Sequence, residues 1–327
     1  MILYCYGTRP EFIKIKKLIA LSKDIPHKVL YVSQHKDIVL GNYDFKIDIK
    51  AGLNRLDDII SSILSNKIEE VFKDIQYVLV QGDTATSFGV ALAAFHREIK
   101  VIHLEAGLRT YDNKNPYPEE AYRQFTSRIT DIHLCPTLLN RDNLLRENAQ
   151  GEIYVVGNTV IDNLNNENIS YEDIVLITLH RRENHNSIID WFTEINLLAK
   201  KHSHIRFILP IHPNPNVYKH KNILTNVEII NPVNHDEFIN LMKKSKLLIS
   251  DSGGIQEEAA FLKKKVIVCR KKTERSESIN TNSFLCKEPS DLKMIFEQLI
   301  NDYNTDYPCP YGDGKSSEKI IEILSKL

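Results

Sequence analysis

Short apolar segments alternate with longer segments of helical period along almost the whole chain, and this alternation constrains the fold more than any other feature. In the first half of the chain the short segments, rich in Val, Ile, Leu and Tyr, are residues 2–6, 28–33, 77–81, 100–105, 131–135 and 153–157. Regular alternation of this kind predicts repeated βαβ units. Strands that are apolar on both faces are typical of parallel sheets covered by helices on both sides. We therefore predict an α/β fold with a doubly wound, Rossmann-like sheet.

The same pattern starts again in the second half, after a polar, Asn-rich segment at residues 165–172. The second set of apolar segments comprises residues 174–178, 205–209, 227–230, 246–250 and 265–269. The length of 327 residues also suggests about two domains. We predict one Rossmann-like domain over residues 1–166 and a second over residues 171–312. The last segment, residues 313–327, predicts an amphipathic helix that could pack on either domain.

The charge balance and the composition exclude several classes of protein. The chain carries 42 Lys and Arg against 43 Asp and Glu, a formal net charge of -1, so no strong field favours nucleic acid or an anionic membrane. No apolar run approaches the roughly 20 residues of a membrane-spanning helix, and no basic leader precedes the first strand, so we expect a cytoplasmic protein. The five cysteines form no C-x-x-C pair, and no H-E-x-x-H motif occurs. Neither a disulfide framework nor a metal site is predicted.

In open α/β sheets ligands bind beyond the carboxyl ends of the strands, so the residues that follow the predicted strands are the candidates for function. After the first strand, Thr8 and Glu11 fit a capping box. Capping does not explain Arg9, a cation at the positive end of a helix, and we expect Arg9 to meet an anion such as phosphate. Asp83 follows another strand at the start of a helix, either as a simple N-cap or as a functional carboxylate.

Further carboxylates follow in the first half of the chain. Glu105 ends a fully apolar strand, and a carboxylate in that position is costly unless it is paired or functional. Arg109 is its predicted partner. Glu119 and Glu120 stand in the first turn of the next helix, where the helix dipole favours acidic residues. One of the two satisfies the dipole, and either could take part in chemistry.

In the second half, His180 follows a strand and precedes two arginines, Arg181 and Arg182. We interpret His180 as a proton carrier or as a ligand of a pyrophosphate. His212 follows the next strand and is a candidate of the same kind.

Residues 251–254, Asp-Ser-Gly-Gly, lie between a strand and a helix. Glycines there allow backbone N–H groups to approach a phosphate at the helix N-terminus, and the hydroxyl of Ser252 adds a donor. Glu257 and Glu258 would then be close enough to accept hydrogen bonds from a ribose. A tight turn without a ligand is the alternative. Neither a dinucleotide fingerprint nor a Walker loop is present, so we predict a mononucleotide such as a nucleotide sugar.

Eight motifs, in this order along the chain, together resemble the non-hydrolysing UDP-N-acetylglucosamine 2-epimerase family. They are GTRPE at 7–11, QGDTATS at 81–87, HLEAGLRT at 103–110, PEEAYR at 118–123, GNTVID at 157–162, HRREN at 180–184, HPNPNV at 212–217 and DSGGIQEE at 251–258. The resemblance covers about residues 1–280. It implies a GT-B-like fold of two Rossmann-like domains, with the active site in the cleft between them and a C-terminal helix that could cross back to the first domain.

The resemblance also implies the reaction, which is reversible epimerisation at C2 of UDP-GlcNAc to UDP-ManNAc by elimination and re-addition of UDP through a glycal. It implies that Asp83, Glu105 and Glu120 supply the acid, the base and the stabilisation of an oxocarbenium-like state, with His180 near the leaving diphosphate. The residues expected to contact the substrate are Arg9, Arg109, Arg181, His212, Ser252, Gly253, Gly254 and Glu258, with Glu258 on the ribose. No metal or nicotinamide is implied. The resemblance does imply a homodimer that supplies ManNAc-type donors for cell-surface polysaccharide.

Many bacterial members of the family are activated by a second UDP-GlcNAc, which contacts a Gln-His pair and an Arg-Gln pair. Gln34 and His35 match the first pair and are the predicted allosteric contacts. The second pair falls on Leu53 and Asn54, so the chain keeps one half of this pattern.

Four other functions stay open. A hydrolysing 2-epimerase, which releases free ManNAc and UDP, shares the fold, but we would expect an Arg after Asp83, where Thr84 stands. An epimerase of a related diacetamido sugar or uronic acid would differ in loops outside the motifs. A GT-B glycosyltransferase would need an acceptor groove in place of three carboxylates. A non-catalytic UDP-sugar-binding protein would have no reason to retain the acidic set.

Overall fold

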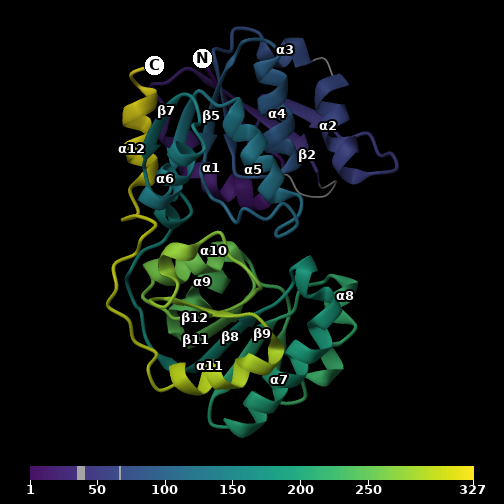
Figure 1. Cartoon of the computed structure of the whole chain (residues 1–327), viewed down its shortest axis with the longest axis vertical. Coiled ribbons are helices and arrows are strands. Elements are labelled where there is room, and N and C mark those ends of the chain that lie inside the picture. Colours follow the sequence, from purple (N-terminus) through teal and green to yellow (C-terminus); the bar gives the residue numbers. More distant parts are fainter. Residues whose placement is uncertain (35–40, 66–67) are drawn as a thin grey trace. The chain divides into compact units, whose positions relative to one another are not determined.

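The computed structural model describes residues 1–34, 41–65 and 68–327. The chain forms two compact units (Figure 1). The first unit contains Met1–Asn163 and Gly312–Leu327, and the second contains Leu164–Tyr311. The chain therefore leaves the first unit once and returns to it for its last segment.

The first unit is built on a parallel sheet with the strand order β3-β2-β1-β4-β5-β6-β7 among the described residues. The strands are β1 Ile2–Tyr6, β2 His27–Ser33, β3 Phe45–Asp48, β4 Tyr77–Gln81, β5 Lys100–Leu104, β6 Ile132–Cys135 and β7 Glu152–Val155. The order reverses between β1 and β4. This reversal is the point at which an open α/β sheet leaves room for a ligand beyond its carboxyl edge.

Helices cover both faces of this sheet. They are α1 Arg9–Leu21, α2 Arg55–Ser65, α3 Ile68–Phe72, α4 Ala85–Phe95, α5 Glu119–Arg128, α6 Leu138–Arg146 and α12 Ser316–Leu324. Alternate residues of β1 point to opposite sides: Tyr4 packs in a cluster with side chains of α1 and α12, and Leu3 packs in a cluster with those of α2, α3 and α4. The C-terminal helix α12 packs against α1 and buries Ile320 and Leu324.

The second unit repeats this architecture with the strand order β10-β9-β8-β11-β12-β13, again with parallel neighbours. The strands are β8 Glu172–Thr178, β9 Arg206–Pro210, β10 Glu228–Ile230, β11 Ser245–Ser250, β12 Val266–Cys269 and β13 Ser283–Cys286. The helices are α7 Ile188–Lys201, α8 Pro215–Tyr218, α9 His235–Lys244, α10 Gly253–Phe261 and α11 Leu292–Leu299. The order reverses between β8 and β11, so functional residues are expected after these two strands.

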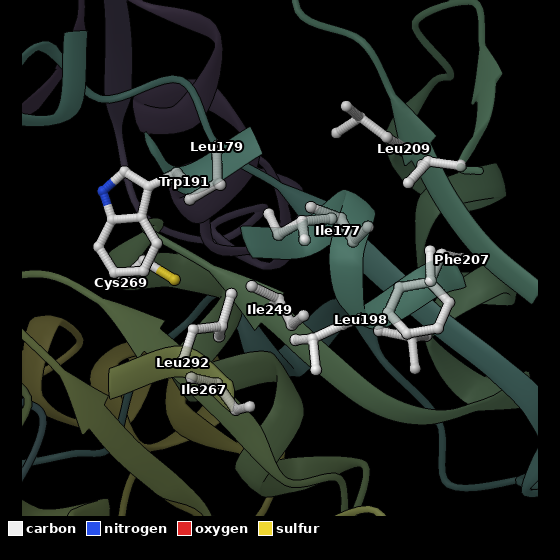
Figure 2. Packing of buried hydrophobic residues seen from close by; sticks show 14 of the residues in the cluster. Ile177, Leu179, Trp191, Leu198, Phe207, Leu209, Ile249, Ile267, Cys269 and Leu292 are labelled. Carbon is white, nitrogen blue, oxygen red and sulfur yellow. The ribbon is translucent and has the colours of Figure 1, made fainter. Parts of the chain in front are cut away.

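The core of the second unit lies between its sheet and the helices α7 and α11 (Figure 2). Trp191 of α7, Leu292 of α11 and Ile249 of β11 are all at most 1% exposed. Helices α9 and α10 pack on β8, β11 and β12. Both units are therefore α/β folds with one parallel sheet, and the predicted fold class is confirmed.

Two edge strands, β3 and β13, were not predicted. Of the four residues of β3, Ile47 alone is buried, and the two middle residues of β13, Phe284 and Leu285, are only half-buried at the edge of its sheet. Edge strands carry little of the continuous apolar signal that marks a buried parallel strand. In the described part of the chain, no helix has the length and apolar character needed to cross a membrane.

Candidate functional site

Asp83 lies directly after β4, and it pairs with Arg123 of α5. The prediction that Asp83 could be a simple N-cap is wrong. The N-cap of α4 is Thr84, whose hydroxyl accepts a hydrogen bond from the N–H of Ser87 at 3.1 Å. The Asp83 carboxylate is partly exposed, at 25%. Asp83 thus combines a charged partner with access to a ligand.

Glu105 follows β5, the parallel neighbour of β4, and is almost completely buried. Lys14 Nζ of α1 lies 2.7 Å from Glu105 Oε1 and 2.6 Å from Oε2, and Asn158 Nδ2 donates to Oε1 at 3.2 Å. Gln81, the last residue of β4, donates to Oε2. The carboxylate that the sequence predicted to be costly is therefore compensated by a cation and two amides.

The predicted pairing of Glu105 with Arg109 is wrong. Arg109 donates to both carboxylate oxygens of Glu147, at 2.8 and 2.9 Å, and to the hydroxyl of Ser127 at 2.7 Å. Arg109 is 6% exposed. Its guanidinium therefore connects α5 with the end of α6 within the first unit, and its carboxylate partner is Glu147 instead of Glu105.

Glu105 also has a backbone conformation that favours glycine, with a φ of 67°. A residue with a Cβ pays about 1 kcal/mol or more for this region. Gly82, in the turn after β4, has a φ of 73° and lies against Glu105, because a Cβ on Gly82 would be 3.5 Å from Glu105 Oε2. Strain of this kind persists where the surroundings fix it and is concentrated at functional sites.

Glu120 is completely buried in the first turn of α5. Its carboxylate accepts hydrogen bonds from the N–H of Thr110 at 2.9 Å and of Tyr111 at 3.1 Å. Gln124 and Arg123 donate to the same carboxylate, at 2.9 and 3.2 Å. Glu120 therefore orders the loop after β5, and its predicted catalytic role stays a prediction.

The turn after β1 has the predicted capping box. The Thr8 hydroxyl accepts from the N–H of Glu11, and Glu11 Oε2 accepts from the N–H of Thr8 at 2.6 Å and of Gly7 at 3.0 Å. Burial raises the pKa of Glu11. Arg9 is exposed at the start of α1, so its guanidinium is accessible to an anion.

His103, which sequence reasoning did not single out, supports the turn that carries Asp83. It is completely buried in β5, and its Nε2 lies 2.7 Å from the carbonyl oxygen of Gly82. Burial lowers the pKa of His103 to about 4. A neutral imidazole therefore holds the Gly82 carbonyl. The signal that could have identified His103 is a polar residue inside the otherwise apolar segment 101–104.

In the second unit, His180 lies two residues after β8 and Asp251 lies directly after β11. The N–H groups of His180 and Arg181 donate to Asp251 Oδ2 at 3.0 and 2.8 Å, and Asn184 Nδ2 donates to the same oxygen at 3.0 Å. Asp251 is completely buried. The predicted residue His180 is thus held at the switch point of this sheet by a carboxylate from the neighbouring strand.

The rings of His180 and His212 stack, with centroids 5.1 Å apart and an interplanar angle of 15°. Burial lowers the pKa of both imidazoles, and the negative charge of Asp251 opposes that shift. The structure therefore brings together two histidines that follow different strands, β8 and β9.

The Asp-Ser-Gly-Gly segment forms the predicted turn into α10, which begins at Gly253 with Ser252 as its N-cap. The Ser252 side chain makes no capping hydrogen bond. A Cβ on Gly253 would lie 2.6 Å from Arg275 Nη1, whereas a Cβ on Gly254 would meet nothing within 4 Å. The helix N-terminus presents backbone N–H groups, which suit an anion, and the guanidinium beside it is paired with the carboxylates of Glu257 and Glu274.

The two carboxylates of α10 have different surroundings. Glu257 is completely buried and accepts a hydrogen bond from Arg275 Nε at 2.8 Å. Glu258 is 5% exposed, and His235 Nε2 lies 2.8 Å from its Oε1. The ribose contact of Glu258 stays a prediction, and the sequence did not reveal its imidazole partner.

A cavity of about 530 Å³ lies beside Gln34, at the carboxyl ends of β2 and β3. Lys46 and Arg55 line it together with Asp48 and Asp58. Gln34 also contacts the first βα turn, because its amide donates to the Thr86 hydroxyl and lies 2.8 Å from the position of a Cβ on Gly7. The other predicted allosteric residue, His35, lies outside the described residues. Over residues 1–34, 41–65 and 68–327, no group of three or more His, Cys, Asp or Glu could hold a metal ion.

Comparisons with known proteins agree with the resemblance seen in the motifs. The family model described as UDP-N-acetylglucosamine 2-epimerase matches residues 19–325. The UDP-N-acetylglucosamine 2-epimerase of Campylobacter jejuni is 36% identical over 378 residues, with 99% of this chain and 97% of that protein covered. The corresponding protein of Neisseria meningitidis serogroup A is 38% identical over 372 residues, with 99% of each covered.

Solved structures give the same result. The crystal structure of UDP-GlcNAc 2-epimerase from Neisseria meningitidis bound to UDP-GlcNAc matches with a TM-score of 0.89 and 36% sequence identity, and the match covers 100% of both chains. Together with the two parallel α/β units and the residues that follow their strands, these matches show that the chain belongs to the UDP-N-acetylglucosamine 2-epimerase family.

Proposed function

We propose that the protein interconverts UDP-GlcNAc and UDP-ManNAc by eliminating UDP across C1 and C2 and adding it back with inversion at C2. The observation that supports this most directly is the position of Asp83 and Glu105, two carboxylates that follow the neighbouring parallel strands β4 and β5. Adjacent parallel strands end at the same edge of a sheet, so both groups serve one ligand.

The chemistry needs a base on one face of the sugar and an acid on the other, because the proton at C2 is removed and then returned to the opposite face. Asp83 and Glu105 take these two roles in the proposal. Lys14 and Arg123, which pair with them, keep the two carboxylates in place and balance their charge.

The second unit binds the UDP moiety in this proposal. The N–H groups of Gly253 and Gly254 and the hydroxyl of Ser252 donate hydrogen bonds to a phosphate at the N-terminus of α10. His180, Arg181 and His212 face the same diphosphate, and its release as a leaving group is favoured by nearby donors and cations. Glu258 accepts hydrogen bonds from the ribose. Arg9, exposed at the start of α1, supplies a further cation.

The test is proton NMR of the purified protein with UDP-GlcNAc in deuterated buffer. The expected product is UDP-ManNAc that carries deuterium at C2, because the removed proton exchanges with solvent. Free ManNAc with UDP would instead identify a hydrolysing enzyme. No reaction with UDP-GlcNAc, but turnover of a diacetamido sugar nucleotide, would identify a different substrate.

Variants test the assigned residues. Asp83→Asn and Glu105→Gln should each lower turnover by about 10²- to 10⁴-fold, the usual range for a general acid or base, with little change in UDP affinity. Glu258→Ala should weaken UDP binding by about tenfold or more. Asp57→Asn, at an exposed position of α2, is the control. Near-normal turnover of either acidic variant would remove that residue from the assignment.

We also propose that the enzyme is a cytoplasmic homodimer that supplies ManNAc-type donors for cell-surface polysaccharide. Light scattering of the purified protein measures the mass directly, and a monomer would contradict the dimer. Cell fractionation tests the compartment, and loss of ManNAc-containing polysaccharide in a deletion strain tests the pathway.

The cavity beside Gln34 is the proposed site of a second UDP-GlcNAc. Its two cations, Lys46 and Arg55, suit a diphosphate. Initial rates should then rise sigmoidally with UDP-GlcNAc, and Gln34→Ala should make the curve hyperbolic. A hyperbolic curve for the unmodified protein would exclude activation through this cavity.

A further inference from the structure

We infer that Asp251 is a positioning residue that fixes His180 and Arg181 to the start of α10, so that the loop after β8 and the turn after β11 present their donors to one diphosphate. The inference rests on the proposed function for the identity of that ligand. Asp251 belongs to the DSGGIQEE motif. Neither the residue patterns nor the family resemblance gave this residue a role.

The geometry shows how the carboxylate connects the two segments. Asp251 directly precedes Ser252, the N-cap of α10, and its own N–H donates to the carbonyl oxygen of Thr178, the last residue of β8, at 3.2 Å. Its side chain accepts the N–H groups of His180 and Arg181. The main chain and the side chain of one residue therefore hold the end of β8 and the loop that follows it.

The carboxylate is placed for this task and not for contact with a ligand. Its exposed fraction is 0%, and three N–H donors converge on Oδ2. One of them, Asn184 Nδ2, also donates to the carbonyl oxygen of Cys269 at the end of β12, at 2.9 Å. A buried carboxylate is stable only with such charge-assisted hydrogen bonds, so its position is fixed to within the tolerance of those bonds.

The same carboxylate acts on the charge of His180. Asp251 Oδ1 lies 3.7 Å from His180 Nδ1, and the other groups that act on this imidazole are the hydroxyl of Thr178 at 3.3 Å, the stacked ring of His212, and the side chains of Arg181 and His185. Asp251 carries the negative charge in this set. It therefore favours the imidazolium, the form that best stabilises a leaving diphosphate.

The test uses Asp251→Asn in the full-length protein. The substituted amide keeps one oxygen for Arg181 and Asn184 and retains the shape of the side chain, but it loses the charge. The His180 imidazole, followed by NMR and assigned with His180→Gln, should titrate at a lower pH than in the unmodified protein. Turnover should fall by up to about 100-fold, the effect of a small misplacement of a reacting or binding group, and KM should change less than kcat. Asp173→Asn, an exposed aspartate of the same unit, should change neither.

Asp251→Asn with an unchanged His180 titration and unchanged kcat would overturn the inference. A variant that lowers the melting temperature but leaves both readouts unchanged would overturn it as well, because that is the result of a purely structural role. If Asp251→Asn does not fold, Asn184→Ala takes its place, since it removes one donor and leaves the carboxylate. Its kcat should fall in the same direction, and a normal kcat would overturn the inference.

These outcomes are separate from those of the proposed function. If the unmodified protein does not epimerise UDP-GlcNAc, the His180 titration still decides whether Asp251 controls that imidazole. If it does epimerise UDP-GlcNAc and Asp251→Asn behaves normally, the positioning role fails and the function stands.

Discussion

Lys14 Nζ lies 2.7 and 2.6 Å from the two carboxylate oxygens of Glu105, so a lysine of the first helix is the cation that compensates the buried carboxylate after β5. Lys14 is partly buried, with 14% of its side chain exposed. Removing either partner would leave the other charge buried without its counter-ion, which is strongly destabilising for the site.

We predict that Lys14→Met and Glu105→Gln each abolish most of the turnover and that the double variant is little worse than either single one. The reason is that the two residues act as one unit, and a double-mutant cycle measures their coupling. Lys16→Met, at an exposed position of the same helix, should leave turnover unchanged. Fully additive losses would show that Lys14 acts on the substrate independently of Glu105.

The buried carboxylate of Glu120 leads to a prediction about stability. Glu120→Gln should lower the free energy of unfolding by about 2–3 kcal/mol, because two backbone N–H groups and Arg123 lose a charged acceptor. Urea unfolding followed by circular dichroism measures the change.

Glu119→Gln is the matched variant that tests which glutamate takes part in the reaction, since the sequence alone allowed either Glu119 or Glu120. If Glu119 carries the chemistry, its variant loses turnover while Glu120→Gln loses mainly stability. An inactive Glu120→Gln that unfolds at the normal urea concentration would give Glu120 a direct role in the chemistry, beside Asp83 and Glu105.

The local part of the site could be predicted from the sequence, because a strand followed by a cap or by glycines leaves a short-range signal. The capping box of Thr8 and Glu11 and the turn at Ser252 are examples, and both are confirmed. Partners brought together by the topology could not be predicted. Lys14 stands between two isoleucines in a helical segment, and its spacing gives no reason to pair it with Glu105.

Arg275 shows the same limit in the second unit. Its guanidinium meets Glu257 and packs against Gly253, although it follows β12 in a stretch without apolar period. The strand order places the end of β12 beside β11, and this order is a property of the whole sheet. The misassigned Arg109 has the same origin, because nearness in sequence to Glu105 suggested a pair that the fold does not make.

Burial of His103 predicts a loss of stability in acid. The unfolded chain takes up a proton near the ordinary pKa of 6.5, whereas the folded protein resists protonation until about pH 4. The unfolded state therefore binds more protons between these values, and the free energy of unfolding should fall by up to about 3 kcal/mol as the pH drops through this window.

His103→Asn removes this titration and keeps an N–H donor for the Gly82 carbonyl. Its free energy of unfolding should depend less steeply on pH between 6.5 and 4 than that of the unmodified protein, as measured by urea unfolding at several pH values. His204→Asn, at an exposed position, should leave the dependence as it is. Equal slopes for the unmodified protein and His103→Asn would mean that the buried imidazole does not contribute.

Asp162 of the GNTVID motif holds the C-terminal helix on the first unit. Its carboxylate accepts the N–H of Ser316 at 2.9 Å and also that of Ser317, the first two residues of α12. Because Asp162 supplies the acceptor that a local N-cap residue would normally provide, Asp162→Ala should destabilise the docked helix by about 0.5–2 kcal/mol. Limited proteolysis should then cleave near residue 315 faster than in the unmodified protein, since cleavage follows the population of the undocked helix when docking is fast.

The control is Asp313→Ala. This variant removes an exposed aspartate that precedes α12 and pairs with Lys319 of that helix. Equal cleavage rates for Asp162→Ala and Asp313→Ala would show that the apolar contacts of Ile320 and Leu324 with α1 are sufficient to hold α12 in place.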